Sequence, residues 1–345
     1  MNVITPKTLI CCVAGKSGGH ILPCLQFAKT HFESNTELIF ISTTASLDKK
    51  IISSFELNDH LALYLPPIPY KAFWRLPFFC ISTIRACIQS LWYLKKHNPS
   101  RIVSTGGFIS LPVCFAAWIL QIPIDLFELN AVPGKATLLI SKLATNIFIC
   151  FEESKTFFKA KCILANYPIR FSEQDTLISS EIARTKLGFS PLKQTILILG
   201  GSQGSEFLNT VIQKIPNTFL SNYTIIHQTG QAQISDCSTF YTTHGIEARV
   251  FGYESNIASY YQAADLVICR AGAGTLFETV FFKKPCIIIP LETNTTDHQL
   301  NNAYAIQKAH TETMIVLRQK DIVTNPILFF TSIQKVLANQ VKVQN

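Results

Sequence analysis

Short β-branched runs alternate with longer helical patterns along the whole chain, and this rhythm restricts the possible folds more than any other feature. Buried strands are predicted at 8–13, 37–42, 101–104 and 123–128, and again at 195–199, 224–228, 266–269 and 286–290. Strands that alternate with helices form parallel sheets covered by helices on both faces. We therefore predict an α/β protein with two Rossmann-like parallel-sheet domains.

The predicted domain boundary lies near residue 168, in the proline-containing stretch 166–170, which precedes a polar segment without a strand pattern. This boundary gives domains 1–168 and 169–324. Residues 325–345 are predicted as one helix that opens with a proline and packs back on the first domain. Two such domains facing each other create a cleft, and ligands bind at the carboxyl ends of the strands.

Composition predicts a packed core, because 48% of the 345 residues are apolar and only 15% are charged. The most apolar stretch, residues 111–120, contains Pro112 and is shorter than the roughly 20 residues that a membrane span requires. No secretory signal is visible at the start, so we expect a cytosolic protein. The 11 cysteines form no Cys-x-x-Cys pair and mostly lie in apolar runs, so we expect core residues and no metal site.

The net charge of +8 is concentrated in the first half of the chain. Residues 1–168 carry 16 Lys plus Arg against 9 Asp plus Glu, whereas residues 169–345 carry 14 against 13. Without Arg-rich runs or aromatic RNA-binding signatures this is a weak nucleic-acid signal, and an anionic membrane surface explains it equally well. We expect no nucleic acid partner.

Four glycine-bearing loops directly follow predicted strands, at 15–20, 106–108, 200–205 and 271–275. Glycine lets backbone N–H groups approach an anion closely, and the N-terminus of the following helix adds a favourable dipole. A tight strand-to-helix turn would explain any one loop, but four of them in two domains favour phosphate binding.

Familiar nucleotide-binding motifs do not fit these loops. Gly15, Lys16 and Ser17 resemble the end of a P-loop, but the first glycine of that motif would fall on Ile10. The glycine spacing also differs from the dinucleotide fingerprint, which disfavours a dehydrogenase.

Divalent metal is not expected, because the sequence has no Asp-x-Asp pair to hold it against a diphosphate. Helix dipoles, together with Arg170 or Arg270, would have to stabilise a leaving diphosphate instead.

Several polar side chains beside the loops are candidates for chemistry. His20 ends the first loop, where its imidazole could take a proton from a hydroxyl; the alternative is a purely structural histidine. Glu278 lies one turn after Thr275, which is expected to open a helix, so it could bind two ribose hydroxyls or form a capping box with Thr275. Asp297 and Gln299 follow another strand end and are placed to bind sugar hydroxyls.

Residues 65–81 combine many aromatic side chains with Lys71 and Arg75, which is typical of a bilayer interface. The alternative is that they form the core of a long loop and helix. Four prolines in this span argue against a regular core helix, so we favour interfacial binding.

Motifs that carry a family resemblance extend from about residue 8 to residue 305. In the first half they are 15–20 with Pro23, 106–112, and Glu128 with 130–134. In the second half they are Pro168 with Arg170, 200–204, 227–230, 270–278, and 297–299 with Asn302 and Ala303. In order and spacing these motifs closely resemble the MurG family, peripheral membrane glycosyltransferases that add N-acetylglucosamine to lipid-linked N-acetylmuramoyl pentapeptide in peptidoglycan synthesis.

This resemblance implies a GT-B fold, with the nucleotide sugar held by the second domain and the lipid acceptor by the first. His20 would be the catalytic base, Gln299 would touch the donor sugar, and uracil would meet backbone near Glu254. The UDP part would be bound by Arg170, Ser202, Ala273, Gly274, Thr275, Leu276, Phe277 and Glu278. The acceptor side would be lined by Ser17, Gly18, Gly19, Gly106, Gly107, Glu128 and Asn130. No cofactor and no metal are implied.

Five positions depart from the family pattern. Lys16 stands where glycine is usual, Phe127 and Leu129 replace a usual His and Gln, and the pair at 166–167 replaces Gly and Asn. The polar groups lost beside Glu128 bear on recognition of the acceptor.

The predicted reaction is inverting transfer of N-acetylglucosamine from UDP-N-acetylglucosamine to a polyprenyl-diphosphate-linked muramoyl pentapeptide. We expect a peripheral enzyme at the cytoplasmic face of the cell membrane that contacts the anionic inner surface through residues 65–81. Two alternatives remain. One is a GT-B transferase for another lipid, such as diacylglycerol, and the other is a catalytically silent nucleotide-sugar-binding protein at the membrane.

Overall fold

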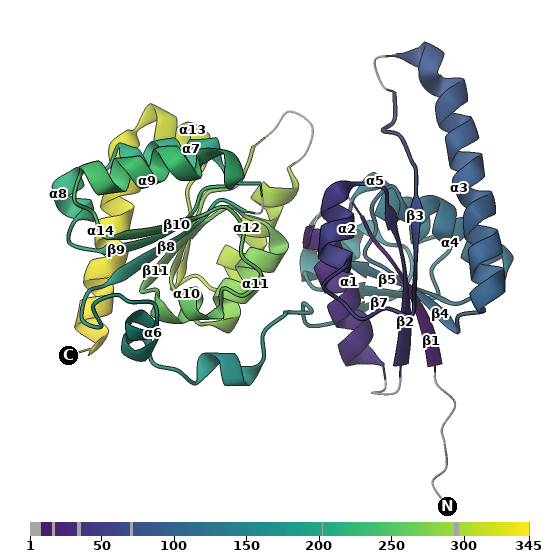
Figure 1. Ribbon diagram of the computed structural model, residues 1–345, viewed down its shortest axis with the longest axis horizontal. Coiled ribbons are helices and arrows are strands. Elements are labelled where there is room, and N and C mark those ends of the chain that lie inside the picture. Colours follow the sequence, from purple (N-terminus) through teal and green to yellow (C-terminus); the bar gives the residue numbers. More distant parts are fainter. Residues whose placement is uncertain are drawn as a thin grey trace, which may run out of the picture. The chain divides into compact units, whose positions relative to one another are not determined.

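The computed structural model describes residues 8–15, 18–32, 36–69, 72–201, 203–292 and 297–344. The chain forms two compact units, Met1–Arg170 and Phe171–Asn345. Each unit is an α/β structure with a central parallel sheet (Figure 1).

The first unit contains a seven-stranded parallel sheet in the order β3-β2-β1-β4-β5-β6-β7. Its strands are β1 (Thr8–Val13), β2 (Thr36–Thr43), β3 (Asp59–Leu63), β4 (Arg101–Ser104), β5 (Ile124–Glu128), β6 (Asn146–Ile149) and β7 (Cys162–Leu164). Its α-helices are α1 (Gly18–His31), α2 (Ser46–Ile52), α3 (Leu76–His97), α4 (Ser110–Ile119) and α5 (Lys135–Ile140).

The second unit contains a six-stranded parallel sheet in the order β10-β9-β8-β11-β12-β13. Its strands are β8 (Thr195–Leu199), β9 (Thr224–Gln228), β10 (Ala248–Phe251), β11 (Leu266–Cys269), β12 (Cys286–Ile288) and β13 (Met314–Val316). Its α-helices are α6 (Ser180–Lys186), α7 (Glu206–Gln213), α8 (Asn217–Leu220), α9 (Ile234–Thr243), α10 (Ala258–Ala263), α11 (Ala273–Phe281), α12 (His298–Ala309), α13 (Gln319–Thr324) and α14 (Pro326–Gln344).

All eight strands predicted from the sequence are present, because each is a run that the sheet buries on both faces. Five strands were missed: β3, β6, β7, β10 and β13. Four of these lie at sheet edges, where short and half-exposed strands carry a weak pattern.

The first six strands of each unit follow the same order. The first three are added toward one edge of the sheet, and the fourth is added on the other side of the first strand. In the first unit this change of direction lies between β1 and β4, and in the second between β8 and β11. The loops after these strands therefore emerge side by side at the carboxyl edge of each sheet, where α/β proteins bind ligands.

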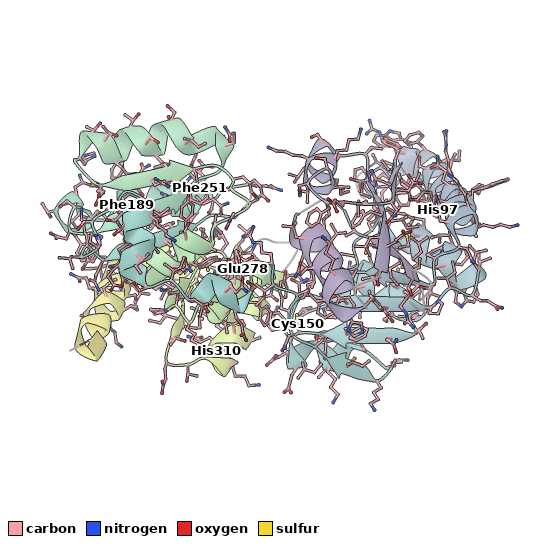
Figure 2. All side chains as sticks on the ribbon, turned by 60° about the horizontal axis from the view of Figure 1, so that its bottom comes forward. His97, Cys150, Phe189, Phe251, Glu278 and His310 are labelled. Carbon is pink, nitrogen blue, oxygen red and sulfur yellow. The ribbon has the colours of Figure 1, made fainter. Side chains whose placement is uncertain are left out.

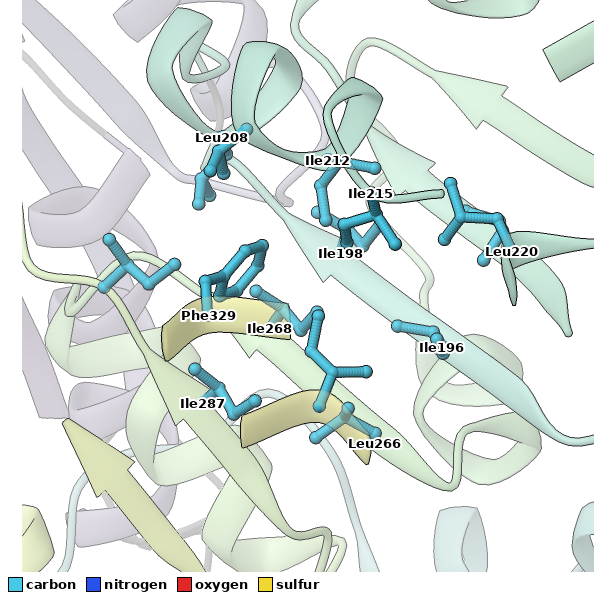
Figure 3. Packing of buried hydrophobic residues seen from close by; sticks show 14 of the residues in the cluster. Ile196, Ile198, Leu208, Ile212, Ile215, Leu220, Leu266, Ile268, Ile287 and Phe329 are labelled. Carbon is cyan, nitrogen blue, oxygen red and sulfur yellow. The ribbon is translucent and has the colours of Figure 1, made fainter. Parts of the chain in front are cut away.

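The C-terminal helix α14 belongs to the second unit, so the prediction that it packs back on the first domain is wrong. Its side chains Phe329, Ile333, Val336 and Leu337 are buried in the core of the second sheet. Figure 3 shows Phe329 beside Ile268 and Ile287 of that sheet. The spacing of these side chains places them on one helical face, and burial of that face decides where the helix packs.

Within the described residues, no helix has the length and apolar character needed to cross a bilayer. The apolar stretch at residues 111–120 forms α4, with Val113 and Cys114 in the core. No cluster of three or more potential metal ligands occurs in the described part of the chain.

The packing of α14 predicts how truncation of its individual side chains changes stability. Phe329→Ala removes a fully buried ring and is expected to destabilise the second unit by about 3–5 kcal/mol. The control Ile327→Ala lies on the exposed side of the same helix and should change stability by less than about 0.5 kcal/mol. Urea unfolding followed by circular dichroism measures both. Equal stability of the two variants would contradict the observed packing.

Candidate active site

The ring of His20 is oriented by the loop that follows β4. His20 lies in the first turn of α1, and its Nδ1 is 3.0 Å from the carbonyl oxygen of Thr105. Because a carbonyl only accepts, Nδ1 carries the proton, and the neutral ring has its lone pair on Nε2. The hydroxyl of Thr105 donates in return to the carbonyl oxygen of His20 at 3.0 Å. The first bond fixes the tautomer that a general base requires, and the second ties the His20 backbone to the same loop.

Glycine is required where the loop after β4 turns. Gly106 and Gly107 have φ values of 80° and 83°, a left-handed conformation that other residues rarely adopt. A Cβ on Gly106 would lie 2.4 Å from the hydroxyl oxygen of Thr137, whereas a Cβ on Gly107 would meet no atom within 4 Å. The backbone at Gly107 is therefore open to a ligand. Gly18 and Gly19 begin α1 beside His20, and Ser17 lies outside the described residues.

Glu128 ends β5 and is almost completely buried. Its Oε1 accepts hydrogen bonds from the backbone N–H of Asn130 at 2.8 Å and from Nδ2 of the same residue at 3.0 Å, while Oε2 has no hydrogen-bond partner in the described part of the chain. Burial raises the pKa of the Glu128 carboxyl to about 7, although the bonds from Asn130 oppose this. Nδ2 of Asn130 donates to the Glu128 carboxyl, so the amide oxygen of Asn130 points away from that carboxyl.

Apolar residues occupy the positions on either side of Glu128 in the chain. Phe127 is buried and stacks on Phe27, with ring centroids 4.9 Å apart, and it also contacts Phe148. Leu129 is buried as well. The two departures from the family pattern at these positions are therefore apolar core residues.

The loops after β8 and β9 of the second unit are in close backbone contact at two glycines. A Cβ on Gly204, after β8, would lie 2.2 Å from the carbonyl oxygen of Thr229, and a Cβ on Gly230, after β9, would lie 2.6 Å from that of Gln203. Only glycine permits this approach. Ser202 falls outside the described residues.

The N-terminus of α11 is open, and it corrects one expectation. The helix begins at Ala273 with Gly272 as its N-cap, not at Thr275, so Thr275 and Glu278 do not form a capping box. The first turn has no acidic residue and no side-chain cap, and the first N–H groups of a helix have no partner within it. The backbone at Ala273, Gly274 and Thr275 is therefore suited to bind an anion.

Glu278, labelled in Figure 2, lies farther along α11 with Leu276 and Phe277. It is largely buried, and the hydroxyl of Tyr261 donates to its Oε2 at 3.1 Å. Tyr261 was not foreseen from the sequence, because it comes from α10 and meets Glu278 only through the fold.

Arg270 is a buried cation that donates hydrogen bonds to residues following β8 and β12. Nε of Arg270 donates to the Ser205 hydroxyl at 2.8 Å, and its Nη1 donates to the carbonyl oxygen of Ile289 at 3.1 Å. The guanidinium also lies 5.5 Å from the centre of the Phe207 ring. Burial lowers the pKa of Arg270 to about 10, which leaves it charged at neutral pH. Arg270 thus links Ser205, the N-cap of α7, to the end of β12 and places positive charge between them.

Gln299 links the ends of β11 and β12. Its Oε1 accepts from the backbone N–H of Ala271 at 3.2 Å and from that of Leu291 at 2.9 Å. Because the oxygen is used within the protein, the NH₂ group is what this side chain presents to a ligand. Asp297 is the N-cap residue of the same helix, α12.

Two further predicted residues are Glu254 and Arg170. Glu254 follows β10, and its carboxylate accepts a hydrogen bond from the Tyr260 hydroxyl. Arg170 is the last residue of the first unit. Thr105 is a contact that sequence reasoning missed, although its place before two glycines at a strand end was a usable signal.

Comparison with known proteins identifies two matching domain families. The glycosyltransferase family 28 N-terminal domain matches residues 10–149, and the C-terminal domain of the same family matches residues 195–340.

Curated relatives extend the match over almost the whole chain. A UDP-N-acetylglucosamine--N-acetylmuramyl-(pentapeptide) pyrophosphoryl-undecaprenol N-acetylglucosamine transferase of Thermosipho africanus is 31% identical over 91% of this chain and 87% of its own length. The transferase of the same name from Myxococcus xanthus is 31% identical over 88% of this chain and 78% of its own. The crystal structure of Acinetobacter baumannii MurG superposes with a TM-score of 0.70 at 23% identity, covering 96% of this chain and 92% of that one. The fold is therefore GT-B, as predicted.

The raised pKa of Glu128 predicts a stability effect that depends on pH. Its pKa is higher in the folded state than its ordinary value of 4.5, so its contribution to stability is complete below about pH 4.5 and is lost as pH rises through about 7. Glu128→Gln removes this titration and should be more stable than the parent at about pH 8, by on the order of 3 kcal/mol, with no such gain at about pH 4. Thermal unfolding at both pH values measures the difference.

The matched control is Glu152→Gln, at an exposed position of the same unit. Its stability to thermal unfolding should equal that of the parent at both pH values. A Glu128→Gln variant whose advantage is the same at low and high pH would contradict a titrating buried carboxyl.

Proposed function

The chain belongs to the MurG family of glycosyltransferases, and from this premise we propose how it transfers N-acetylglucosamine from UDP-N-acetylglucosamine to lipid-linked N-acetylmuramoyl pentapeptide in peptidoglycan synthesis. The observation that carries the mechanism is the Nδ1 bond of His20 to Thr105, because it leaves the basic lone pair on Nε2.

The second unit is proposed to bind the donor. The N–H groups at Ala273, Gly274 and Thr275, with Ser202 and Arg170, would hold the diphosphate, and uracil would meet the backbone near Glu254. Leu276 and Phe277 complete the same turn.

Donor recognition also uses two oriented polar groups. Glu278 would accept hydrogen bonds from the ribose hydroxyls, with Tyr261 steadying its carboxylate. The NH₂ group of Gln299 would donate to oxygen atoms of the donor sugar, since its oxygen is occupied by backbone N–H groups.

The first unit is proposed to bind the acceptor and start the reaction. Nε2 of His20 removes the proton of the acceptor hydroxyl, and the oxygen forms a bond to the anomeric carbon as the bond from that carbon to UDP breaks. The electron pair leaves with the diphosphate, and attack from the opposite face inverts the anomeric configuration. The amide oxygen of Asn130, oriented by Glu128, would accept a hydrogen bond from the acceptor.

The leaving diphosphate is proposed to be stabilised by main-chain N–H groups and by the positive end of α11. Arg270 supplies a fixed charge behind these loops, held in place by Ser205 and Ile289. Fixed dipoles and charges of this kind need no reorganisation during the reaction.

Two acceptors supplied with radiolabelled UDP-N-acetylglucosamine test the function. We expect transfer to polyprenyl-diphosphate-linked muramoyl pentapeptide and none to diacylglycerol. His20→Ala should lower kcat by about a hundred- to ten-thousandfold with little change in UDP affinity, the range associated with loss of a general base.

The control His20→Asn keeps a nitrogen near the position of Nδ1 to donate to Thr105 but lacks Nε2. It should lose kcat as His20→Ala does while keeping the parent melting temperature. Full turnover in either variant would remove His20 from the mechanism, and binding of UDP without any transfer by the parent would indicate a silent binding protein.

The exposed apolar surface before and along α3 is proposed to bind the anionic inner face of the membrane. The side chains of Phe73 and Trp74 are 76% and 77% exposed, and Leu76, Phe78 and Ile81 are exposed as well. They are therefore not core residues of a loop and helix. Patches of this kind on a basic domain suit insertion at an anionic bilayer surface. Tyr70 and Lys71 lie outside the described residues.

Flotation with vesicles tests this contact. The parent should bind anionic vesicles more strongly than neutral ones, and Phe73→Ser with Ile81→Ser should weaken binding by about tenfold or more, because two large apolar side chains are lost. Leu192→Ser, at an exposed position of the second unit, is the matched control and should bind as the parent does. Absence of parent binding to both vesicle types would reject the proposal.

A further inference from the structure

A cavity of about 720 Å³ opens in the first unit between the segment after β3 and the start of α3. Its walls include three prolines of that segment, Pro66, Pro67 and Pro69. Proline has no backbone N–H, so this side of the cavity offers few hydrogen-bond donors. A concave apolar site of this size is typical of small-ligand binding.

The rest of the wall is largely aromatic and contains one cation. Trp74, Phe78 and Phe79 contribute rings, and Arg75 is the charged residue among the described residues that line the cavity. A ligand that combines a hydrocarbon body with an anionic group would match this arrangement, since a guanidinium pairs well with phosphate.

The cavity touches the loop that orients the proposed base. The ring of Phe79 stacks on that of Phe108, with centroids 5.5 Å apart. Phe108 directly follows the open backbone of Gly107, and Thr105 in the same loop holds His20. Phe79 therefore connects the cavity wall to the loop that positions the reacting group.

Topology supports the same placement. The strands β3 and β4 run parallel in one sheet, so the segment after β3 and the loop after β4 leave from the same edge. Figure 1 shows the start of α3 beyond the carboxyl end of β3.

We propose that this cavity binds the first isoprene units of the polyprenyl chain of the acceptor, with Arg75 facing the attached diphosphate. The inference rests on the proposed function, because the acceptor is what brings a hydrocarbon chain and a diphosphate in one molecule. Of the side chains proposed to meet the bilayer, Phe73 and Ile81 do not line the cavity, whereas Trp74 and Phe78 do, so the cavity adjoins that surface. The concave site would take the part of the chain next to the diphosphate, which connects that chain to the sugar that reacts.

Kinetics in detergent, without a bilayer, test this assignment. The acceptors are the polyprenyl-diphosphate-linked muramoyl pentapeptide and the same compound with a methyl group in place of the chain. Ala72→Trp fills the cavity, and Ala160→Trp is the matched control at an exposed position of the same unit. Each buried methylene changes affinity by about fourfold, so Ala72→Trp should lower the ratio of kcat/KM for the long acceptor to that for the short one by about tenfold or more. The ratio should stay at the parent value in Ala160→Trp.

Calorimetry with farnesyl diphosphate separates this inference from the function itself, because it needs no turnover. The parent should bind farnesyl diphosphate more tightly than inorganic diphosphate, with a negative heat-capacity change, and Ala72→Trp should lose that preference. Equal binding of the two diphosphates, or an unchanged kcat/KM ratio in Ala72→Trp, would overturn the cavity assignment. Failure of the parent to transfer to either acceptor, with farnesyl binding intact, would overturn the function and leave the cavity assignment standing.

Discussion

Parallel pairing of β1 with β4, and of β8 with β11, is the constraint on which both halves of the site depend. In each sheet these two strands are neighbours although many residues separate them in the chain. Their loops therefore leave the sheet side by side, and the helices that follow start at the same edge. His20 is oriented in this way by Thr105 from the neighbouring loop, and Gln299 is oriented by backbone of the loop after β11.

Close packing of loops at that edge depends on glycine, and it brings buried charge with it. Gly204 and Gly230 allow the backbones of two loops of the second unit to approach more closely than any residue with a Cβ would permit. Arg270 donates to Ser205 in the first of these loops and to the carbonyl oxygen of Ile289 after β12, which places a buried charge between them. In the first unit Glu128 is also a buried charged residue at the end of a strand, and its burial raises the pKa of its carboxyl to about 7. Buried groups of this kind act on the site through the side chains they orient.

Apolar surface in the first unit has two forms that suit two different tasks. Protruding side chains such as Phe73 suit a bilayer, and the adjoining cavity beside Pro67 suits a single hydrocarbon chain, with Trp74 and Phe78 belonging to both. The stacking of Phe79 on Phe108 connects the cavity to the loop that holds the base. Lipid recognition and chemistry are thereby joined within one domain.

The local sequence alone determined the α/β class, the eight central strands and the glycine loops, because strand periodicity and glycine are properties of neighbouring residues. It also predicted His20 and Gln299 as candidate site residues, because they lie next to loops that follow predicted strands. Only the tertiary structure decided that α14 packs on the second sheet, because that choice depends on which distant apolar face it covers. The same holds for the start of α11 at Ala273 and for the bonds of Thr105 and Tyr261 to their partners. Contacts between residues far apart in the chain set burial, tautomer and charge, and no local pattern contains them.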